Sequence, residues 1–181
     1  MPIYLIRHGQ SEFNAAHAEA PHIDPMLFDA PLTALGIEQA KALRQQVAGH
    51  RIEHVIASPL IRAIQTAMHI FGDDHPITIN PDMRENLLSS CDVGSHPNDL
   101  KKRFGHLDFD HLPAQWWHGD PEREDRIQVE PEAVFRARAS AVRAYLDQWE
   151  GPTLAVVGHG TFFTELAGYH MQNCEIHQYR A

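Results

Sequence analysis

The stretch Ile3-Tyr4-Leu5-Ile6-Arg7-His8 joins a short apolar run directly to a cation and an imidazole. The run is apolar on both faces and has the usual length of a strand, which predicts a buried central strand of a parallel sheet. Ligands of open α/β sheets bind beyond the carboxyl ends of the strands. We therefore expect Arg7 and His8 to lie at a ligand site.

The residues that follow this strand suit an anion. Gly9 would let the backbone turn sharply and would let an anion approach closely. Ser11 and Asn14 predict the start of a helix, whose free backbone amides favour negative charge. Together with Arg7 and His8 they describe a phosphate site that contains a nucleophile.

Three further motifs appear later in the chain: Ser58-Pro59-Leu60-Ile61-Arg62-Ala63, Met83-Arg84-Glu85 and Val157-Gly158-His159-Gly160. With Arg7-His8-Gly9-Gln10-Ser11 and Asn14, they resemble the signature of the histidine phosphatase superfamily, also called the phosphoglycerate mutase-like family. The resemblance spans nearly the whole chain. It implies a three-layer α/β/α sandwich with a mostly parallel central sheet.

Several donors of the site can hold a phosphate monoester, which is dianionic near neutral pH. Arg7 and Arg62 each offer paired N–H groups to phosphate oxygens. Arg62 is expected on an otherwise buried helix, where a cation needs a nearby anion, and we favour phosphate over a solvated face. His159 would add charge if protonated, Asn14 would add a neutral donor, and Gly9 would leave room for the anion.

The resemblance implies that His8 is the nucleophile and is phosphorylated as a covalent intermediate. Imidazole attacks only when neutral, and neighbouring cations favour that form without any metal. Arg7, Arg62 and His159 would stabilise the transferring group. Glu85 is the candidate proton donor to the leaving oxygen, with Asp82 as an alternative carboxylate.

Periodicity predicts the remaining elements of the fold. The residues between the first motif and Pro31, numbers 15–31, are expected to be an irregular loop that either passes over the site or simply connects two elements. The long helix 131–149 should bury Val134, Ala137, Ala141, Tyr145 and Leu146. Further strands are expected at 52–57, 76–80 and 153–157, with an edge strand at 174–179, and further helices at 33–47, after Ser58-Pro59, at 98–104, at 112–117 and from Thr161.

The whole chain, 1–181, is expected to form one domain with an insertion around 86–129. In relatives this part of the chain holds structure that covers the substrate. Trp116 and Trp117 could wall a pocket, but adjacent tryptophans more often pack an insertion onto the body, which we favour. No role is evident for Cys91.

Composition excludes several classes of function. A formal charge of −9 argues against a general nucleic-acid binder or a polybasic membrane binder. No stretch reaches the ~18 apolar residues of a membrane span, and Cys91 and Cys174 lack a CxxC spacing, so we expect a cytoplasmic protein with spectator thiols, although a disulfide between them stays open. The fourteen histidines form no metal motif, so no metal and no cofactor is expected. No heptad seam indicates an oligomeric state.

Three functions are weighed for a chain with these motifs. A phosphatase acting on a small phosphorylated metabolite is favoured, because Asn86, Leu87 and Leu88 replace the basic and aromatic residues that follow the motif glutamate in the mutases, whose insertion is also longer. A mutase of the phosphoglycerate type is the alternative. A catalytically silent phospholigand-binding module would be expected to lose at least one of the motif residues. Within the phosphatase class, a phosphatase for protein phosphohistidine is less favoured, because the insertion argues against an open cleft that accepts a protein.

Overall fold

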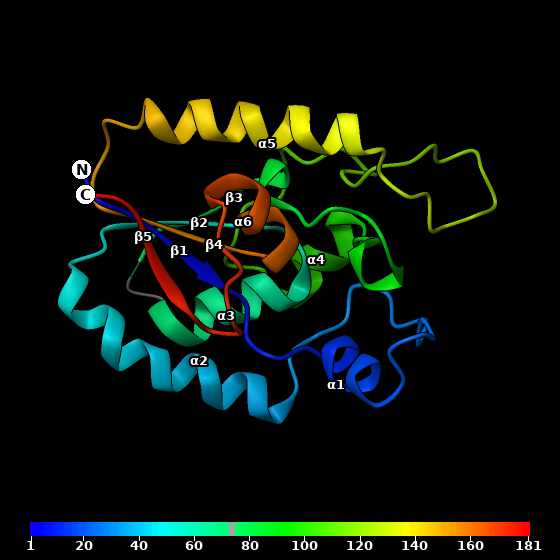
Figure 1. The fold of residues 1–181 in the computed structure, drawn as a ribbon, viewed down its shortest axis with the longest axis horizontal. Helices are drawn as coiled ribbons and strands as arrows, with labels where there is room; N and C mark the ends of the chain where they lie inside the picture. The colour runs from blue at the N-terminus through cyan, green and yellow to red at the C-terminus, as the bar shows by residue number, and fades with distance from the viewer. Residues whose placement is uncertain (73–74) are drawn as a thin grey trace.

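The computed structural model describes residues 1–72 and 75–181, which form a five-stranded sheet between two layers of helices (Figure 1). The strands lie in the order β3-β2-β4-β1-β5, and only β5 runs antiparallel, beside β1. This confirms the predicted three-layer α/β/α sandwich with its mostly parallel sheet and edge strand. The strands are β1 (Ile3–Arg7), β2 (His54–Ala57), β3 (Ile77–Ile79), β4 (Leu154–Gly158) and β5 (Ile176–Arg180).

Helices cover both faces of the sheet, α2 and α3 on one side and α5 and α6 on the other (Figure 1). Thr33 caps the start of α2, because its side chain accepts a hydrogen bond from the Gly36 amide at 3.0 Å. The helices are α1 (Glu12–Glu19), α2 (Ala34–Val47), α3 (Ile61–Phe71), α4 (Pro97–Arg103), α5 (Glu132–Asp147) and α6 (Gly160–Ala167), with 3-10 turns η1 (Ala48–His50), η3 (Pro81–Met83) and η4 (Ser90–Asp92).

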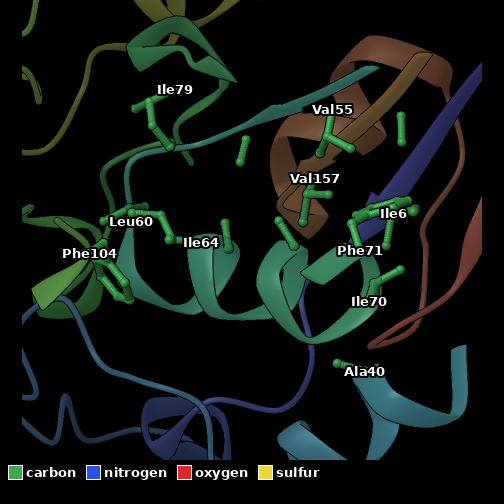
Figure 2. Packing of buried hydrophobic residues seen from close by; sticks show 14 of the residues in the cluster. Ile6, Ala40, Val55, Leu60, Ile64, Ile70, Phe71, Ile79, Phe104 and Val157 are labelled. Atoms are coloured by element: carbon green, nitrogen blue, oxygen red, sulfur yellow. The ribbon is translucent and has the colours of Figure 1, made fainter. Parts of the chain in front are cut away.

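The apolar run of β1 serves two cores at once. Tyr4 and Ile6 pack with α2 and α3, and Figure 2 shows Ile6 above Ile70 and Phe71 of α3. Ile3 and Leu5 face the second core, formed with α5 and α6. Side chains alternate across a strand, so a strand buried on both faces must be apolar throughout. Burying each such side chain contributes about 1.5 to 3 kcal/mol, which fixes the strand that carries the site.

Two expectations about local structure are wrong. Residues 15–31 are not all irregular, because α1 continues to Glu19 through an alanine-rich segment that a capping box at Ser11 and Asn14 starts. Residues 112–117 form no helix. Trp116 instead packs against Gly94 and donates its indole N–H to the Ser95 carbonyl at 3.0 Å. Packing is therefore the role of Trp116.

The buried face of α5 also differs from the predicted one. Val134 and Tyr145 are 45% and 43% exposed, whereas the buried side chains are Phe135, Arg138, Ala139, Val142 and Leu146. The true stripe is rotated by about one residue, which is 100° around a helix. An arginine lies in the middle of this stripe and broke the apolar pattern in the sequence.

The segment 86–129 leaves and rejoins the body at one point. The Glu130 amide donates to the Leu87 carbonyl at 2.9 Å, so the two ends of the segment lie side by side. Between them, Leu100 of α4 and Phe104, the residue that follows this helix, pack into the core. Among the described residues, no helix has the length and apolar character that crossing a membrane requires.

Candidate functional site

Sheet register brings the two motif histidines together. Arg7 of β1 pairs with Gly158 of β4, so His8 and His159, the next residue on each strand, emerge side by side at the carboxyl edge. Their ring centroids lie 5.2 Å apart, with planes inclined by 57°. Ser58 follows the neighbouring strand β2 and donates its amide to the Val157 carbonyl at 3.1 Å. Residues from both ends of the chain therefore meet at one edge.

A cavity of about 200 Å³ opens at this edge of the sheet. His159, which lies beside His8, is fully buried, and neither His159 nor the buried Gly9 lines the cavity. The cavity is lined by Arg7, His8, Ser11, Phe13, Asn14, Arg62, Glu85, Asn86, Leu88, Ser89, Cys91, Asp92, Gly160, Thr161 and His170. It thus gathers His8, two arginines and a glutamate from three separate motifs, and His159 of the fourth motif lies beside His8.

The tautomer of His8 follows from its hydrogen bond. Nδ1 lies 2.7 Å from the Gly9 carbonyl oxygen, which can only accept, so Nδ1 carries the hydrogen. Nε2 is then the nitrogen with the free lone pair. Burial, reinforced by Arg62 and Arg7, holds the pKa of His8 well below its ordinary value, so the ring stays neutral and nucleophilic.

His159 is held by a serine. Its Nε2 lies 2.8 Å from Ser58 Oγ, while Nδ1 is buried without a hydrogen-bond partner among the described residues. Burial, then Arg62 and His8, hold the pKa of His159 well below its ordinary value. The ring is therefore neutral here. A dianion in the cavity would favour its protonated form, which is the form the sequence analysis invoked.

Arg62 has a resident anion that the sequence analysis did not predict. Its Nη2 lies 2.9 Å from Asp92 Oδ1, and its Nη1 donates to the Cys91 carbonyl at 2.6 Å. Asp92 also accepts the amides of Leu88 and Ser89, each at 3.1 Å. Burial raises the pKa of Asp92, while Arg62 and the two amides oppose the rise. The buried cation is thus held by a carboxylate from η4 as well as being open to the cavity.

Arg7 and Asn14 are each oriented by the backbone. Arg7 Nη1 donates to the Met171 carbonyl at 2.5 Å, and its Nε is buried without a partner among the described residues. Asn14 accepts the Ser11 amide on Oδ1 at 3.2 Å, which leaves its amino group as the part able to donate to a ligand. Both side chains line the cavity.

Glu85 closes the side of the cavity nearest α6. Its Oε1 accepts the Asn86 and Phe162 amides at 2.9 and 2.8 Å, and its Oε2 accepts the Thr161 amide at 2.9 Å. The carboxyl group therefore sits at a helix N-terminus. Burial, reinforced by Asp92, nevertheless raises the pKa of Glu85 above its ordinary value. Such a group can hold a proton more readily than a surface glutamate.

Two other sequence expectations can be placed. Asp82 lies outside the cavity lining, with its side chain 62% exposed and 3.7 Å from Arg84. Gly9 is required for close packing rather than for a sharp turn: its φ is not positive, and a Cβ there would lie 2.5 Å from the Gly36 carbonyl oxygen. This contact fixes the start of α2 beneath the site.

No group of three or more potential metal ligands occurs within residues 1–72 and 75–181. Cys91 and Cys174 are both free thiols. Cys91 lines the cavity, and burial raises the pKa of its thiol, so it is not a thiolate at neutral pH.

The family model for histidine phosphatase superfamily (branch 1) matches residues 3–181. The chain belongs to this superfamily. The adenosylcobalamin/alpha-ribazole phosphatase of Escherichia coli is 30% identical over 151 residues, covering 80% of this chain and 70% of the enzyme. Probable phosphoglycerate mutase GpmB of Yersinia pestis is 35% identical over 99 residues, covering 55% of this chain and 43% of that protein.

A crystal structure of the ecdysone phosphate phosphatase from Bombix mori, in complex with tungstate, shares the fold. Its TM-score is 0.65 at 18% identity, covering 97% of this chain and 87% of that one. With its family and its relatives established, this histidine phosphatase is an enzyme of the phosphatase type, which acts through a covalent phosphohistidine intermediate.

Sequence reasoning missed two residues of this site, Ser58 and Asp92. Ser58 was quoted within a motif, but only the strand order β2-β4-β1 shows that it reaches His159. Asp92 lies in an irregular segment with no periodic signal. The burial of Arg62 does require a nearby anion, and that requirement is the one signal in the sequence that points to an acidic residue such as Asp92.

Proposed function

We propose that this histidine phosphatase hydrolyses a small phosphorylated metabolite, with His8 Nε2 as the nucleophile. The observation that carries the proposal is a neutral His8, oriented by the Gly9 carbonyl, at a cavity lined by Arg7 and Arg62. The two arginines would bind the equatorial oxygens of the phosphoryl group, and Asn14 would add a neutral donor.

In the first step His8 Nε2 attacks phosphorus and the bond to the leaving oxygen breaks. The bound dianion favours the protonated form of His159, which lies beside His8. The positive charge of that ring then offsets part of the negative charge on the transferring group. Protonated Glu85 gives its proton to the leaving oxygen. In the second step Glu85, now a carboxylate, accepts a proton from the water that attacks phosphohistidine, which restores His8 and releases phosphate.

The size and lining of the cavity support a small substrate. At about 200 Å³ it accommodates a phosphoryl group together with a small leaving group, whose far end would lie near the exposed side chains of Leu88 and His170. The segment 86–129 contributes Asn86, Leu88, Ser89, Cys91 and Asp92 to this lining, which supports its proposed role in covering the substrate. We also propose that residues 1–181 form a single domain.

A mutase of the phosphoglycerate type is the second candidate, favoured by the match to GpmB. A sugar-acid substrate needs a cation for its carboxylate besides those that bind phosphate. Among the described residues that line the cavity, the only arginines are Arg7 and Arg62, and there is no lysine. Both arginines are required by the phosphoryl group, which supports hydrolysis over the mutase. The complete set of motif residues argues against a silent binding module.

A substrate panel tests the proposal directly. The enzyme should release inorganic phosphate from p-nitrophenyl phosphate and from at least one member of a panel of sugar phosphates, nucleotides, phosphoglycerates and phosphopeptides. Activity should survive EDTA. Transfer of phosphoryl groups between positions of phosphoglycerate, without release of phosphate, would instead establish the mutase. Binding of phosphate esters without turnover would establish the silent module.

We also propose a cytoplasmic location for the protein. Its two free thiols suit a reducing compartment, which supports this location.

A further inference from the structure

A buried ion pair lies directly behind the segment that carries Glu85. Arg138 of α5 binds Glu130 with two parallel hydrogen bonds, from Nε to Oε1 at 3.2 Å and from Nη2 to Oε2 at 2.7 Å. The Glu130 side chain is fully buried and that of Arg138 is 7% exposed. Neither residue lines the cavity. The free energy of desolvating two charges can exceed what their attraction returns, so stability alone does not account for a buried pair in this position.

The remaining N–H groups of Arg138 donate to backbone carbonyls within residues 82–85. Nη1 donates to the carbonyls of Asp82 and Arg84 at 2.9 and 2.8 Å, and Nη2 reaches the Glu85 carbonyl at 3.3 Å. A planar guanidinium can hold several acceptors in fixed directions at once, which an ammonium cannot do. Arg138 therefore holds the backbone at three of the four residues from Asp82 to Glu85.

Glu130 completes the support from its own backbone and side chain. It accepts a hydrogen bond from Arg84 Nη2 at 3.2 Å, and its amide donates to the Leu87 carbonyl at 2.9 Å. The segment from Asp82 to Leu87 is thus bound at several consecutive positions by two residues. This segment contains no helix or strand after η3, so its shape depends on these contacts.

The same arginine also touches the helix that receives the Glu85 carboxyl group. The Arg138 guanidinium carbon lies 5.2 Å from the centre of the Phe162 ring, and the Phe162 amide is one of the donors to Glu85. Backbone and carboxyl group of Glu85 are therefore located relative to one rigid group. Displacements of about 1 Å at a catalytic group can cost 100-fold in rate.

We propose that Arg138, oriented by Glu130, is a positioning residue for the acid Glu85. It holds the Glu85 carboxyl group where it can protonate the leaving oxygen, and it does so without touching substrate. The inference rests on the proposed function, because it has no catalytic consequence unless Glu85 is the leaving-group acid.

The test compares kcat for p-nitrophenyl phosphate, whose leaving group needs little protonation, with kcat for phenyl phosphate, which is similar in size but a poorer leaving group. Arg138→Lys keeps the positive charge but loses the planar guanidinium group, which holds several acceptors in fixed directions. We expect it to lower the phenyl phosphate rate about 10- to 100-fold more than the p-nitrophenyl phosphate rate. Glu85→Gln should show the same selectivity more strongly.

Arg180 offers a matched control. It donates to the carbonyls of Leu146, Asp147 and Trp149 and lies at the opposite edge of the sheet, where it pairs with Ile3. Arg180→Lys should lower thermal stability and leave the ratio of the two rates unchanged. If Arg138→Lys does not fold, Arg138→Met/Glu130→Gln, which removes the pair together, is measured in the same way.

The outcomes separate the two claims. If Glu85→Gln is selective and Arg138→Lys slows both substrates equally or neither, the positioning role is overturned and the acid assignment stands. If Glu85→Gln is not selective, the acid assignment fails and the positioning role fails with it. If neither Arg138 variant folds while Arg180→Lys does, the pair is a folding element and the positioning role is rejected.

Discussion

The two buried imidazoles should make the stability of the protein depend on pH in a definite direction. His8 and His159 have folded-state pKa values well below their ordinary value, because burial and the arginines disfavour the charged rings. The unfolded chain binds protons at these positions as pH falls through about 6.5, and the folded chain does not. The free energy of unfolding therefore decreases with acidification over this range.

The size of the effect has an upper limit. Between about pH 7.5 and about pH 5.5 a histidine that stays neutral when folded costs at most about 1.4 kcal/mol of stability, so the pair costs at most about 2.7 kcal/mol. Buried carboxyls act in the opposite sense, since the pKa of Glu85 is raised, so single variants must be compared with the wild type rather than read alone. His8→Asn and His159→Gln are polar and cannot take up a proton.

The assay is urea unfolding at the two pH values and constant ionic strength. Each single variant should lose up to about 1.4 kcal/mol less on acidification than the wild type, and the double variant up to about 2.7 kcal/mol less. His54→Gln, on a surface that is partly exposed, serves as the control and should give a smaller difference. If His8→Asn and the wild type lose the same free energy, His8 becomes charged normally in the folded protein and the argument for a neutral nucleophile is refuted.

Three further perturbations test separate parts of the site. Asp92→Asn removes a charge that raises the pKa of Glu85, so the alkaline limb of kcat for phenyl phosphate should move to lower pH; an unmoved limb would contradict the link. Gly9→Ala places a Cβ 2.5 Å from the Gly36 carbonyl oxygen and should cost about 1 to 3 kcal/mol in urea unfolding, whereas Gly49→Ala, which meets nothing within 4 Å, should be nearly neutral. Prolonged dialysis against a chelator should leave kcat unchanged, and restoration of lost activity by a divalent metal would contradict a site built only from side chains.

The architecture and the gathering of the motif residues could be predicted because local signals marked them. The apolar run Ile3 to Ile6 fits only a strand buried on both faces, and the chain turns polar at Arg7, where the strand ends. The same pattern recurs before His159. Parallel strands end at the same edge, so placing these residues on strands was nearly enough to bring them together.

The parts that sequence could not supply depend on contacts between segments distant in the chain. Asp92 lies 30 residues from Arg62 in an irregular segment, and no period or motif links the two. Arg138 broke the apolar pattern of α5 and shifted its predicted face, although its burial is explained by Glu130 and by three carbonyl groups. The predicted helix at residues 112–117 does not form, because the Trp116 indole N–H donates to the Ser95 carbonyl instead. In each case tertiary partners outweighed local preference.

The identity of the nucleophile is tested most directly by trapping the covalent intermediate. Enzyme mixed with substrate carrying a labelled phosphoryl group and quenched in alkali during turnover should retain label in a bond that is stable to alkali and labile to acid, and peptide mapping should place it on His8. His8→Asn should retain none and should show no turnover, while His159→Gln should remain folded with reduced label. Label on another residue, or turnover by His8→Asn, would contradict the account.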